Sequence, residues 1–477
     1  MRDATYTSHP LAVYAGNPLI ETLDIIKYPE DFEKVIAERP TIPDDIISYD
    51  PFLAASLIGE LEDTYIPHPN SWHIYQQVTQ QIMAGYRRKN PAALSGKRFL
   101  NNIIVQCQNG NTVEVEKFFG SMAGTTMCSL ATGLSGTGKT ETVRRILRCI
   151  PQTYRHRVYQ GETLNFDQLV WVSFDVTSSN SLKGLAMNFY EAVDAALGTT
   201  AYQDAYKLSE NVDKHINNIR KICARHYIGL VHIDECQHLL KRIGNPNNAT
   251  LDHLESLFNR IGVPMLTTST PEGLRLFFDQ DLENAKLQST RRLISNNVYD
   301  FYPMSRESIF YSSFYETFFP EKVFEGSPVL SESFKSDIHF KTFGLQAVAG
   351  HLMRLFFIAW QAHPKYQEGQ SCFELLDKIY AQHFGATALA INELRKHKAQ
   401  RYEAEQALKQ QAEAQLVALE KSQANKRGQQ PRTIHSSRRG PNMAQAASLW
   451  KLAALDKRLA NVIDHQPLLT GFAEAHK

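Results

Sequence analysis

The eight residues from Gly133 to Thr140, Gly-Leu-Ser-Gly-Thr-Gly-Lys-Thr, constrain the fold of this chain more than any other feature. They fit the pattern G-x-x-x-x-G-K-[ST], in which glycines let consecutive backbone N–H groups turn inward around a phosphate. An apolar run at 125–132 precedes the motif, and a helical pattern at 141–150 follows it. This order predicts a strand, a phosphate-binding loop and a helix whose N-terminus adds partial positive charge. The alternative is a glycine-rich turn that only joins a strand to a helix.

Two side chains of this loop would carry its charge chemistry. Lys139 would neutralise the β- and γ-phosphates of ATP, and the hydroxyl of Thr140 would bind Mg²⁺. The residues expected to contact the nucleotide are Gly133, Leu134, Ser135, Gly136, Thr137, Gly138, Lys139 and Thr140.

Short apolar runs alternate with helical patterns on both sides of the loop. The runs that read as strands are 125–132, 169–175, 227–234 and 263–269. The helical patterns between them are 141–150, 181–197 and 248–261. Unbroken apolar strands separated by helices indicate an α/β fold with a parallel sheet covered on both faces.

The apolar run 227–234 ends in two acidic residues, Asp234 and Glu235. Carboxylates at the carboxyl end of such a strand lie at the edge where α/β sheets bind their ligands. Asp234 would hold Mg²⁺ through water, and Glu235 would polarise the water that attacks the γ-phosphate. A glutamate at this position favours hydrolysis over transfer to another hydroxyl. Alone, such a pair is usually a solvated strand end, so the interpretation depends on the phosphate loop upstream.

Polar residues further along the chain are weaker candidates for the same site. Thr270, or else Ser269, follows the last core strand and would reach the γ-phosphate or the attacking water. Arg291 or Arg292 would reach the γ-phosphate held by an adjacent subunit. Arg354 would contact the phosphates from the same subunit. The alternatives are a simple strand end for the first pair, an exposed ion-pairing surface for the second, and an arginine reaching solvent from the edge of a core for Arg354.

Composition excludes several classes of protein. The chain has 477 residues, and 51 Lys+Arg against 50 Asp+Glu give a net charge of +1, so DNA contact would need a local basic patch. The six cysteines contain no CxxC pair, which argues against a zinc ribbon and a disulfide framework. We find no signal-peptide pattern and no apolar run long enough to span a bilayer, so we expect no membrane association.

Four regions are expected along the chain. An N-terminal adaptor or partner-binding domain would span 1–118, a nucleotide-binding core 119–300, a helical lid 301–395, and a charged tail 396–477 with a basic linker and a short terminal helix. In the first region the proline-bearing segments, 9–23, 28–32 and 42–52, are predicted to be extended or turns, and a helical pattern covers 71–91.

The chain resembles an AAA+ ATPase in the order of its features. These are the phosphate loop, the acidic strand end, the polar strand tip, the arginine pair and the helical lid. The finer resemblance is to the TnsC/TniB group, the ATP-dependent regulators of transposition. It is carried by the sequences at 9–23, 85–91, 133–147, 230–239 and 269–273, and it spans roughly residues 9 to 390.

This resemblance implies a P-loop AAA+ fold, with ATP and Mg²⁺ as cofactors. It also implies a homo-oligomeric ring or helical filament on double-stranded DNA, in the bacterial cytoplasm, which links a target-selector protein to the transposase subunits and which hydrolysis dissolves. The family's nucleotide roles would fall on Gly133 to Thr140, Asp234, Glu235 and Arg291 or Arg292.

Two other functions compete with this one. The first is another DNA-associated AAA+ ATPase, of the origin-binding or helicase-loading type, and the second is a nucleotide-gated scaffold in which hydrolysis is incidental. The sequence leaves open the target selector, the number of subunits, which arginine acts as the finger, and the residues that touch DNA. Lys183 and the basic segment 424–441 are the candidates for that contact.

Overall fold

The structure, a computed structural model, describes residues 1–87, 89–94, 96–98, 105, 128–176, 182–238, 263–271, 297–367 and 369–397. The chain divides into two compact units. The first comprises 1–40 and 63–302, and the second comprises 41–62 and the residues from 303 onward.

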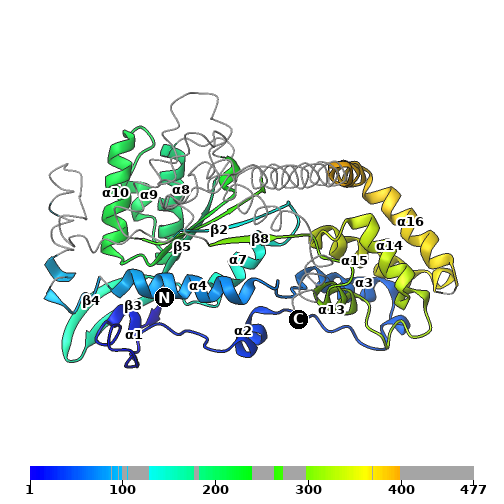
Figure 1. The fold of residues 1–477 in the computed structure, drawn as a ribbon, viewed down its shortest axis with the longest axis horizontal. Helices are drawn as coiled ribbons and strands as arrows, with labels where there is room; N and C mark the ends of the chain where they lie inside the picture. The colour runs from blue at the N-terminus through cyan, green and yellow to red at the C-terminus, as the bar shows by residue number, and fades with distance from the viewer. Residues whose placement is uncertain are drawn as a thin grey trace, which may run out of the picture. The chain divides into compact units, whose positions relative to one another are not determined.

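A parallel five-stranded sheet forms the centre of the first unit (Figure 1). Its spatial order is β5-β6-β7-β2-β8, and each neighbouring pair is parallel. The strands are β2 (Cys128–Gly133), β5 (Trp171–Asp175), β6 (Leu230–Asp234), β7 (Met265–Ser269) and β8 (Val298–Phe301). The predicted α/β fold with a parallel sheet is therefore confirmed.

Helices cover both faces of this sheet (Figure 1). α8 (Leu182–Leu197) and α10 (Val212–Arg225) share one apolar core with the strands, and the short α9 (Ala201–Ala205) adjoins α8. α4 (Ser71–Arg87) and α7 (Lys139–Arg148) share the core on the opposite face. Because both faces are buried, the strands are apolar along their length, which is the pattern that the sequence shows.

A second, smaller sheet was not predicted. Its order is β1-β3-β4, and its strands are β1 (Arg2–Asp3), β3 (Thr153–Tyr159) and β4 (Glu162–Leu169). The β3–β4 hairpin turns at Gln160 and Gly161, whose φ angles are 49° and 85°. Two positive φ angles in a two-residue loop match the twist of antiparallel strands. The glycine after Gln160 was therefore the sequence signal that could have predicted this hairpin.

The described residues of the expected N-terminal domain, 1–118, are divided between the two units, and their role as an adaptor stays a prediction. Residues 1–40 and those from 63 onward pack with the nucleotide-binding core, whereas 41–62 pack with the helices of the second unit. The expected boundary at 118 itself falls outside the described residues. The physical reason is burial: Leu19, Ile20, Phe32 and Ile36 lie in the same apolar core as α4 and α7.

The prediction that the proline-bearing segments are extended or turns holds at 12–16 and 44–45, which are turns, and is wrong where helices begin. α1 (Pro18–Glu21), α2 (Pro29–Ile36) and α3 (Pro51–Gly59) each begin with proline at the first helical position. Proline suits that position because its missing N–H would have no partner there and its φ is already helical. The helix expected at 71–91 is present as α4, which ends at Arg87.

The second unit is helical, in agreement with the prediction for residues 301–395. Its helices are α3, α13 (Ile309–Phe318), α14 (Glu332–Thr342), α15 (Gln346–Ala362), α16 (Ser371–His383) and a helix over 385–397. Aromatic side chains fill its interior. The ring of Phe319 contacts those of Phe324 and Phe356, and the ring of Phe324 also contacts Trp360. Among the described helices, none has both the length and the apolarity needed to cross a membrane.

A buried polar network fastens the N-terminal residues to the β3–β4 hairpin. The Tyr6 hydroxyl lies 2.8 Å from Nδ1 of His156, whose Nε2 lies 2.8 Å from Oε1 of Gln168. Gln168 in turn donates to the carbonyl of Leu19 at 3.1 Å. Burial lowers the pKa of His156 from 6.5 to about 4, so the imidazole is neutral at pH 7.

This burial predicts a loss of stability in acid. Below pH 6.5 the unfolded chain takes up a proton at His156, while the folded protein does not until the pH approaches 4. The free energy of unfolding should therefore fall as the pH drops from 7 to 5, with His156 contributing about 2 kcal/mol of that fall. Urea titrations at both pH values, on the wild type and His156→Gln, measure this share. Equal pH dependence in the two proteins would contradict it.

Candidate nucleotide-binding site

The glycines of the 133–140 loop are required by its backbone. Gly136 and Gly138 have φ angles of 84° and 82°, in the left-handed region that favours glycine, and Gly138 is the N-cap of α7. Gly133 meets a different limit, because a Cβ there would lie 2.2 Å from the carbonyl oxygen of Phe301 on β8. The loop therefore leaves β2 against β8 and curls directly into the N-terminus of α7, as the motif predicts.

Lys139 lies inside this curl, on the first turn of α7. Its Nζ donates to the carbonyl of Leu134 at 2.8 Å, and the Thr137 hydroxyl donates to the same oxygen at 2.8 Å. Only 7% of Lys139 is exposed. Burial lowers the pKa of Lys139, while the negative charges of Glu235 and Asp234 act in the opposite direction. The ammonium group thus belongs to the same electrostatic site as the two carboxylates.

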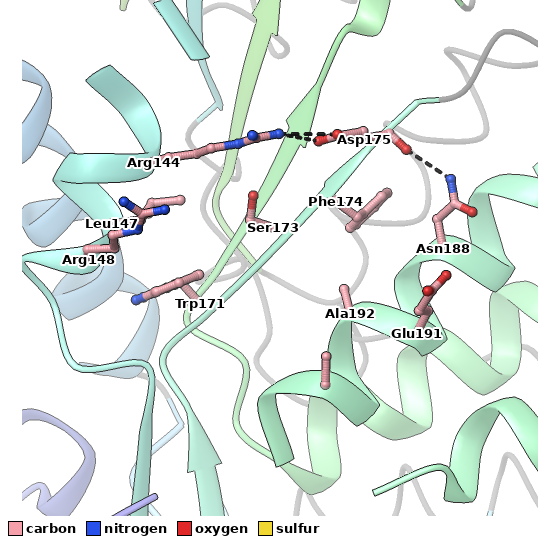
Figure 2. Close-up of a pocket in the computed structure, with 11 residues that line it drawn as sticks. Arg144, Leu147, Arg148, Trp171, Ser173, Phe174, Asp175, Asn188, Glu191 and Ala192 are labelled. Atoms are coloured by element: carbon pink, nitrogen blue, oxygen red, sulfur yellow. Dashed lines mark hydrogen bonds and ion pairs between the residues drawn. The ribbon is translucent and has the colours of Figure 1, made fainter. Parts of the chain in front are cut away.

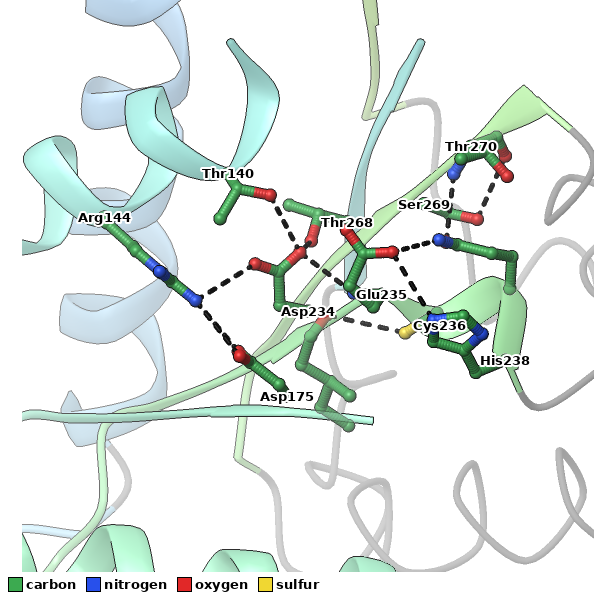
Figure 3. Close-up of polar contacts among 12 residues, drawn as sticks. Thr140, Arg144, Asp175, Asp234, Glu235, Cys236, His238, Thr268, Ser269 and Thr270 are labelled. Atoms are coloured by element: carbon green, nitrogen blue, oxygen red, sulfur yellow. Dashed lines mark hydrogen bonds and ion pairs between the residues drawn. The ribbon is translucent and has the colours of Figure 1, made fainter. Parts of the chain in front are cut away.

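Asp234, at the end of β6, joins three structural elements (Figure 3). Its Oδ1 accepts hydrogen bonds from the Thr140 hydroxyl at 3.3 Å, from the Thr268 hydroxyl on β7, and from the N–H of Glu235 at 2.9 Å. The residue is 1% exposed. Its other oxygen, Oδ2, lies 3.6 Å from an Arg144 nitrogen and receives no hydrogen bond from the described residues.

These residues fit a divalent cation. A buried carboxylate oxygen without a hydrogen-bond donor is costly unless a cation or water satisfies it. Oδ2 of Asp234 receives no hydrogen bond from the described residues, although its ion-pair partner Arg144 lies 3.6 Å away. The Thr140 hydroxyl bonds the other oxygen of the same carboxylate. A carboxylate and a hydroxyl are the oxygen ligands that Mg²⁺ takes from proteins.

Glu235 follows directly, with a left-handed backbone (φ 57°). Its Oε2 accepts a hydrogen bond from the side-chain amide of Gln237 and lies 3.8 Å from Nε2 of His238 (Figure 3). Cys236 is buried, and its Sγ donates to the carbonyl of Ile233 at 3.4 Å. No cluster of three or more potential metal ligands from His, Cys, Asp and Glu occurs among the described residues.

Three hydroxyl residues stand in sequence at the end of β7, and one of them contacts the acidic pair. Thr268 bonds Asp234, and the sequence analysis missed this residue. Ser269 donates instead to the carbonyl of Thr270 at 3.0 Å. The N–H of Thr270 donates to the amide oxygen of Gln237 at 3.1 Å, while its hydroxyl is buried without a partner in the described structure. Period-two alternation along β7, which puts Thr268 and Thr270 on one side of the strand, was the signal that points to Thr268.

The remaining predicted residues are two arginines near the end of the core and one in the second unit. Arg291 and Arg292 lie outside the described residues. Arg354 belongs to α15 in the second unit, where its guanidinium forms an ion pair with Glu62 and lies 3.3 Å from Nδ1 of His351. Its contact with phosphate stays a prediction.

Residues before the core brace α7 from outside the motif. The Tyr65 hydroxyl donates to the Thr142 hydroxyl at 2.9 Å, and both side chains are buried. The Arg145 guanidinium lies 4.6 Å from the centre of the Tyr65 ring and bonds Glu38 at 2.9 Å. Aromatic and charged residues of this kind are common, and no sequence pattern marked these as partners of the loop helix.

A cavity of about 500 Å³ adjoins the acidic pair without including the loop (Figure 2). Its walls come from α7, β5 and α8, and no residue of 133–140 is among those that line it. Arg144 connects the two places: one of its nitrogens lies 3.1 Å from both carboxylate oxygens of Asp175 and 3.6 Å from Asp234. The cavity is thus a neighbour of the site and not the phosphate-binding position.

Comparison with known proteins identifies the domain. Residues 123–277 match the family model described as an AAA domain. Curated protein sequences give no significant match. Solved structures with a similar arrangement include the Orc1 protein of Aeropyrum pernix in complex with DNA, a Walker-type ATPase of Pyrococcus abyssi and Cdc6p of Pyrobaculum aerophilum.

These structures are distant from the chain. The identities are 16%, 14% and 13%, and the TM-scores are 0.34, 0.33 and 0.27. The matches cover 59%, 60% and 55% of this chain and 65%, 75% and 62% of the others, so the Orc1 and Cdc6p matches span less than two thirds of those proteins. The AAA-domain match, together with the P-loop at 133–140 and the parallel sheet, shows an AAA+ ATP-hydrolase domain.

Removal of the Thr268 hydroxyl tests how much its hydrogen bond to the buried Asp234 carboxylate stabilises the fold. Thr268→Val keeps the shape and deletes a hydrogen bond to a charged group, so we expect a loss of about 1.5–3 kcal/mol in the free energy of unfolding. Thr267→Val is the matched control, because the Thr267 hydroxyl donates to a neutral carbonyl, that of Ser129, at 3.2 Å. The control should lose only about 0.5–1.5 kcal/mol. Urea unfolding compares the two, and a larger loss in the control would refute the role given to Thr268.

Proposed function

We propose that this chain is an ATP-dependent AAA+ regulator of DNA transposition. It assembles on double-stranded DNA when it binds ATP and Mg²⁺, it couples a target-selector protein to the transposase subunits, and ATP hydrolysis dissolves the assembly. The nucleotide chemistry is supported by the site, and the role in transposition is supported by the sequence resemblance to the TnsC/TniB group.

The convergence of Lys139, Thr140, Asp234 and Glu235 on one sheet edge carries the proposal. Lys139 would neutralise the β- and γ-phosphates, and Thr140 with Asp234 would hold the metal. Glu235 is the base that orients and polarises the attacking water. The Thr270 hydroxyl, which is buried without a partner among the described residues, would bond the γ-phosphate or that water.

The family-specific segments of the sequence support the finer assignment because they pack against one another. Nδ2 of Asn17, in the segment 9–23, donates to the carbonyl of Tyr86 at 2.9 Å. Nδ2 of Asn90, in the segment 85–91, donates to the carbonyl of Gly16 at 2.9 Å. Two of the five segments that carry the resemblance thus lie together in the first unit, held by amide-to-backbone hydrogen bonds in both directions.

Assembly would complete the site. In the proposal an arginine of a neighbouring copy, Arg291 or Arg292, reaches the γ-phosphate, so ATP binding favours a ring or filament. Arg354 would contact the phosphates within the same copy. Lys183, on the first turn of α8, would face DNA.

Two substitutions test the nucleotide roles. Lys139→Ala should abolish ATP binding, because the buried ammonium is lost, and with it assembly on DNA. Glu235→Gln should bind ATP normally and lower turnover by about 10²–10⁴-fold, since general-base catalysis supplies that factor. Its assemblies on duplex DNA should therefore persist. Phosphate release, fluorescent-nucleotide binding and electron microscopy measure the three effects.

Lys34→Ala provides the control, because Lys34 is an exposed lysine of the same unit that pairs with Asp31. It should leave ATP binding and assembly unchanged. A Lys139→Ala protein that assembles normally would disprove the phosphate-loop assignment. Turnover that is unaffected by DNA or by a transposase would favour the nucleotide-gated scaffold instead.

A further inference from the structure

We propose that Gln237 is a positioning residue that ties the Glu235 carboxylate to the end of strand β7. The inference rests on the proposed function, in which Glu235 polarises the attacking water. It adds a residue that touches neither nucleotide nor metal and that acts by fixing where the base lies.

The side-chain amide of Gln237 makes both connections. The amide nitrogen of Gln237 donates to Oε2 of Glu235, and its amide oxygen accepts from the backbone N–H of Thr270 at 3.1 Å. The three groups therefore lie in a row from the strand β7 terminus to the carboxylate. An amide suits this place because it offers a donor and an acceptor on one rigid plane.

The turn that carries Gln237 is fixed independently of the amide. Residues 236–238 form one 3-10 turn after Glu235, and the N–H of His238 donates to the Glu235 carbonyl at 3.0 Å. Cys236 anchors the turn, since its side chain is 2% exposed in the core between the sheet and α8. Gln237 thus projects from a rigid base.

Glu235 needs such a partner. Its side chain is 43% exposed, and a half-exposed glutamate samples several rotamers unless a neighbour selects one. Nε2 of His238 lies 3.8 Å from Oε2, beyond hydrogen-bond distance, so Gln237 supplies the donor. The described contacts of the carboxylate fall on Oε2, which leaves Oε1 to accept from water.

The second connection links the base to the expected phosphate contact. The Thr270 N–H is occupied by Gln237, whereas the Thr270 hydroxyl is buried without a partner in the described structure. When that hydroxyl bonds a γ-phosphate, any movement of Thr270 shifts the Gln237 amide and, through it, Glu235. The orientation of the base therefore depends on the occupancy of the phosphate site.

Gln237→Met tests the positioning role, because methionine keeps the side-chain length and removes both hydrogen bonds. We expect kcat to fall about ten- to hundredfold, since a misplacement of about 1 Å has that effect on a reacting group. The KM for ATP and the affinity for a fluorescent ATP analogue should change by less than about twofold, because ground-state binding does not involve the Glu235 carboxylate.

A second variant covers a possible failure of the first to fold. Gln237→Glu keeps an acceptor for the Thr270 N–H and sets a carboxylate against Glu235 in place of a donor. Its kcat should fall at least as far as that of Gln237→Met, with nucleotide affinity again retained. Gln152→Met is the matched control, because the Gln152 amide donates to the Trp171 carbonyl at 3.3 Å, away from the acidic pair, and its kcat should stay unchanged.

The combination with Glu235→Gln decides between positioning and a general structural role. If Gln237 acts through Glu235, adding Gln237→Met to Glu235→Gln leaves the residual turnover unchanged. An equal further loss in that background, or a wild-type kcat in both Gln237 variants, would overturn the proposal. Wild-type turnover in Glu235→Gln alone would instead overturn the role of Glu235 in the proposed function.

Discussion

The buried carboxylate of Asp234 is the contact on which the rest of the site depends. A negative charge that is 1% exposed is tolerated only where donors or cations compensate it. The donors come from three places, the loop helix α7, the strand β7 and the next residue of the chain. The charge therefore holds these three elements together, and its second oxygen, Oδ2, lies 3.6 Å from an Arg144 nitrogen.

The loop and its helix α7 are supported by residues far from the motif in the sequence, both before and after it. Tyr65 bonds Thr142 of α7 and stacks on the Arg145 guanidinium of the same helix, and the Phe301 backbone lies against Gly133. His68 stacks on the Phe301 ring at 4.3 Å between centroids, which extends the same support to β8. The N-terminal residues thus act as part of the core.

Much of the fold was predictable because it depends on periodicity. The four apolar runs are strands of one parallel sheet, and the helices after the loop and after β5 begin within two residues of the predicted positions. The β3–β4 hairpin was missed because its strands mix polar and aromatic residues at a half-buried edge. The prolines at 18, 29 and 51 were read as turns, although the same residue begins a helix equally well.

By itself, the sequence determined the loop, the acidic pair and the strand order in the chain, because each depends on residue types at short, fixed spacings. It did not determine which hydroxyl of β7 meets Asp234, or that Gln237 reaches Thr270, 33 residues further on. Those contacts depend on the register between parallel strands, in which Ile233 lies opposite Thr267. Register is set by how the helices pack on the two faces of the sheet, and only the folded chain decides it.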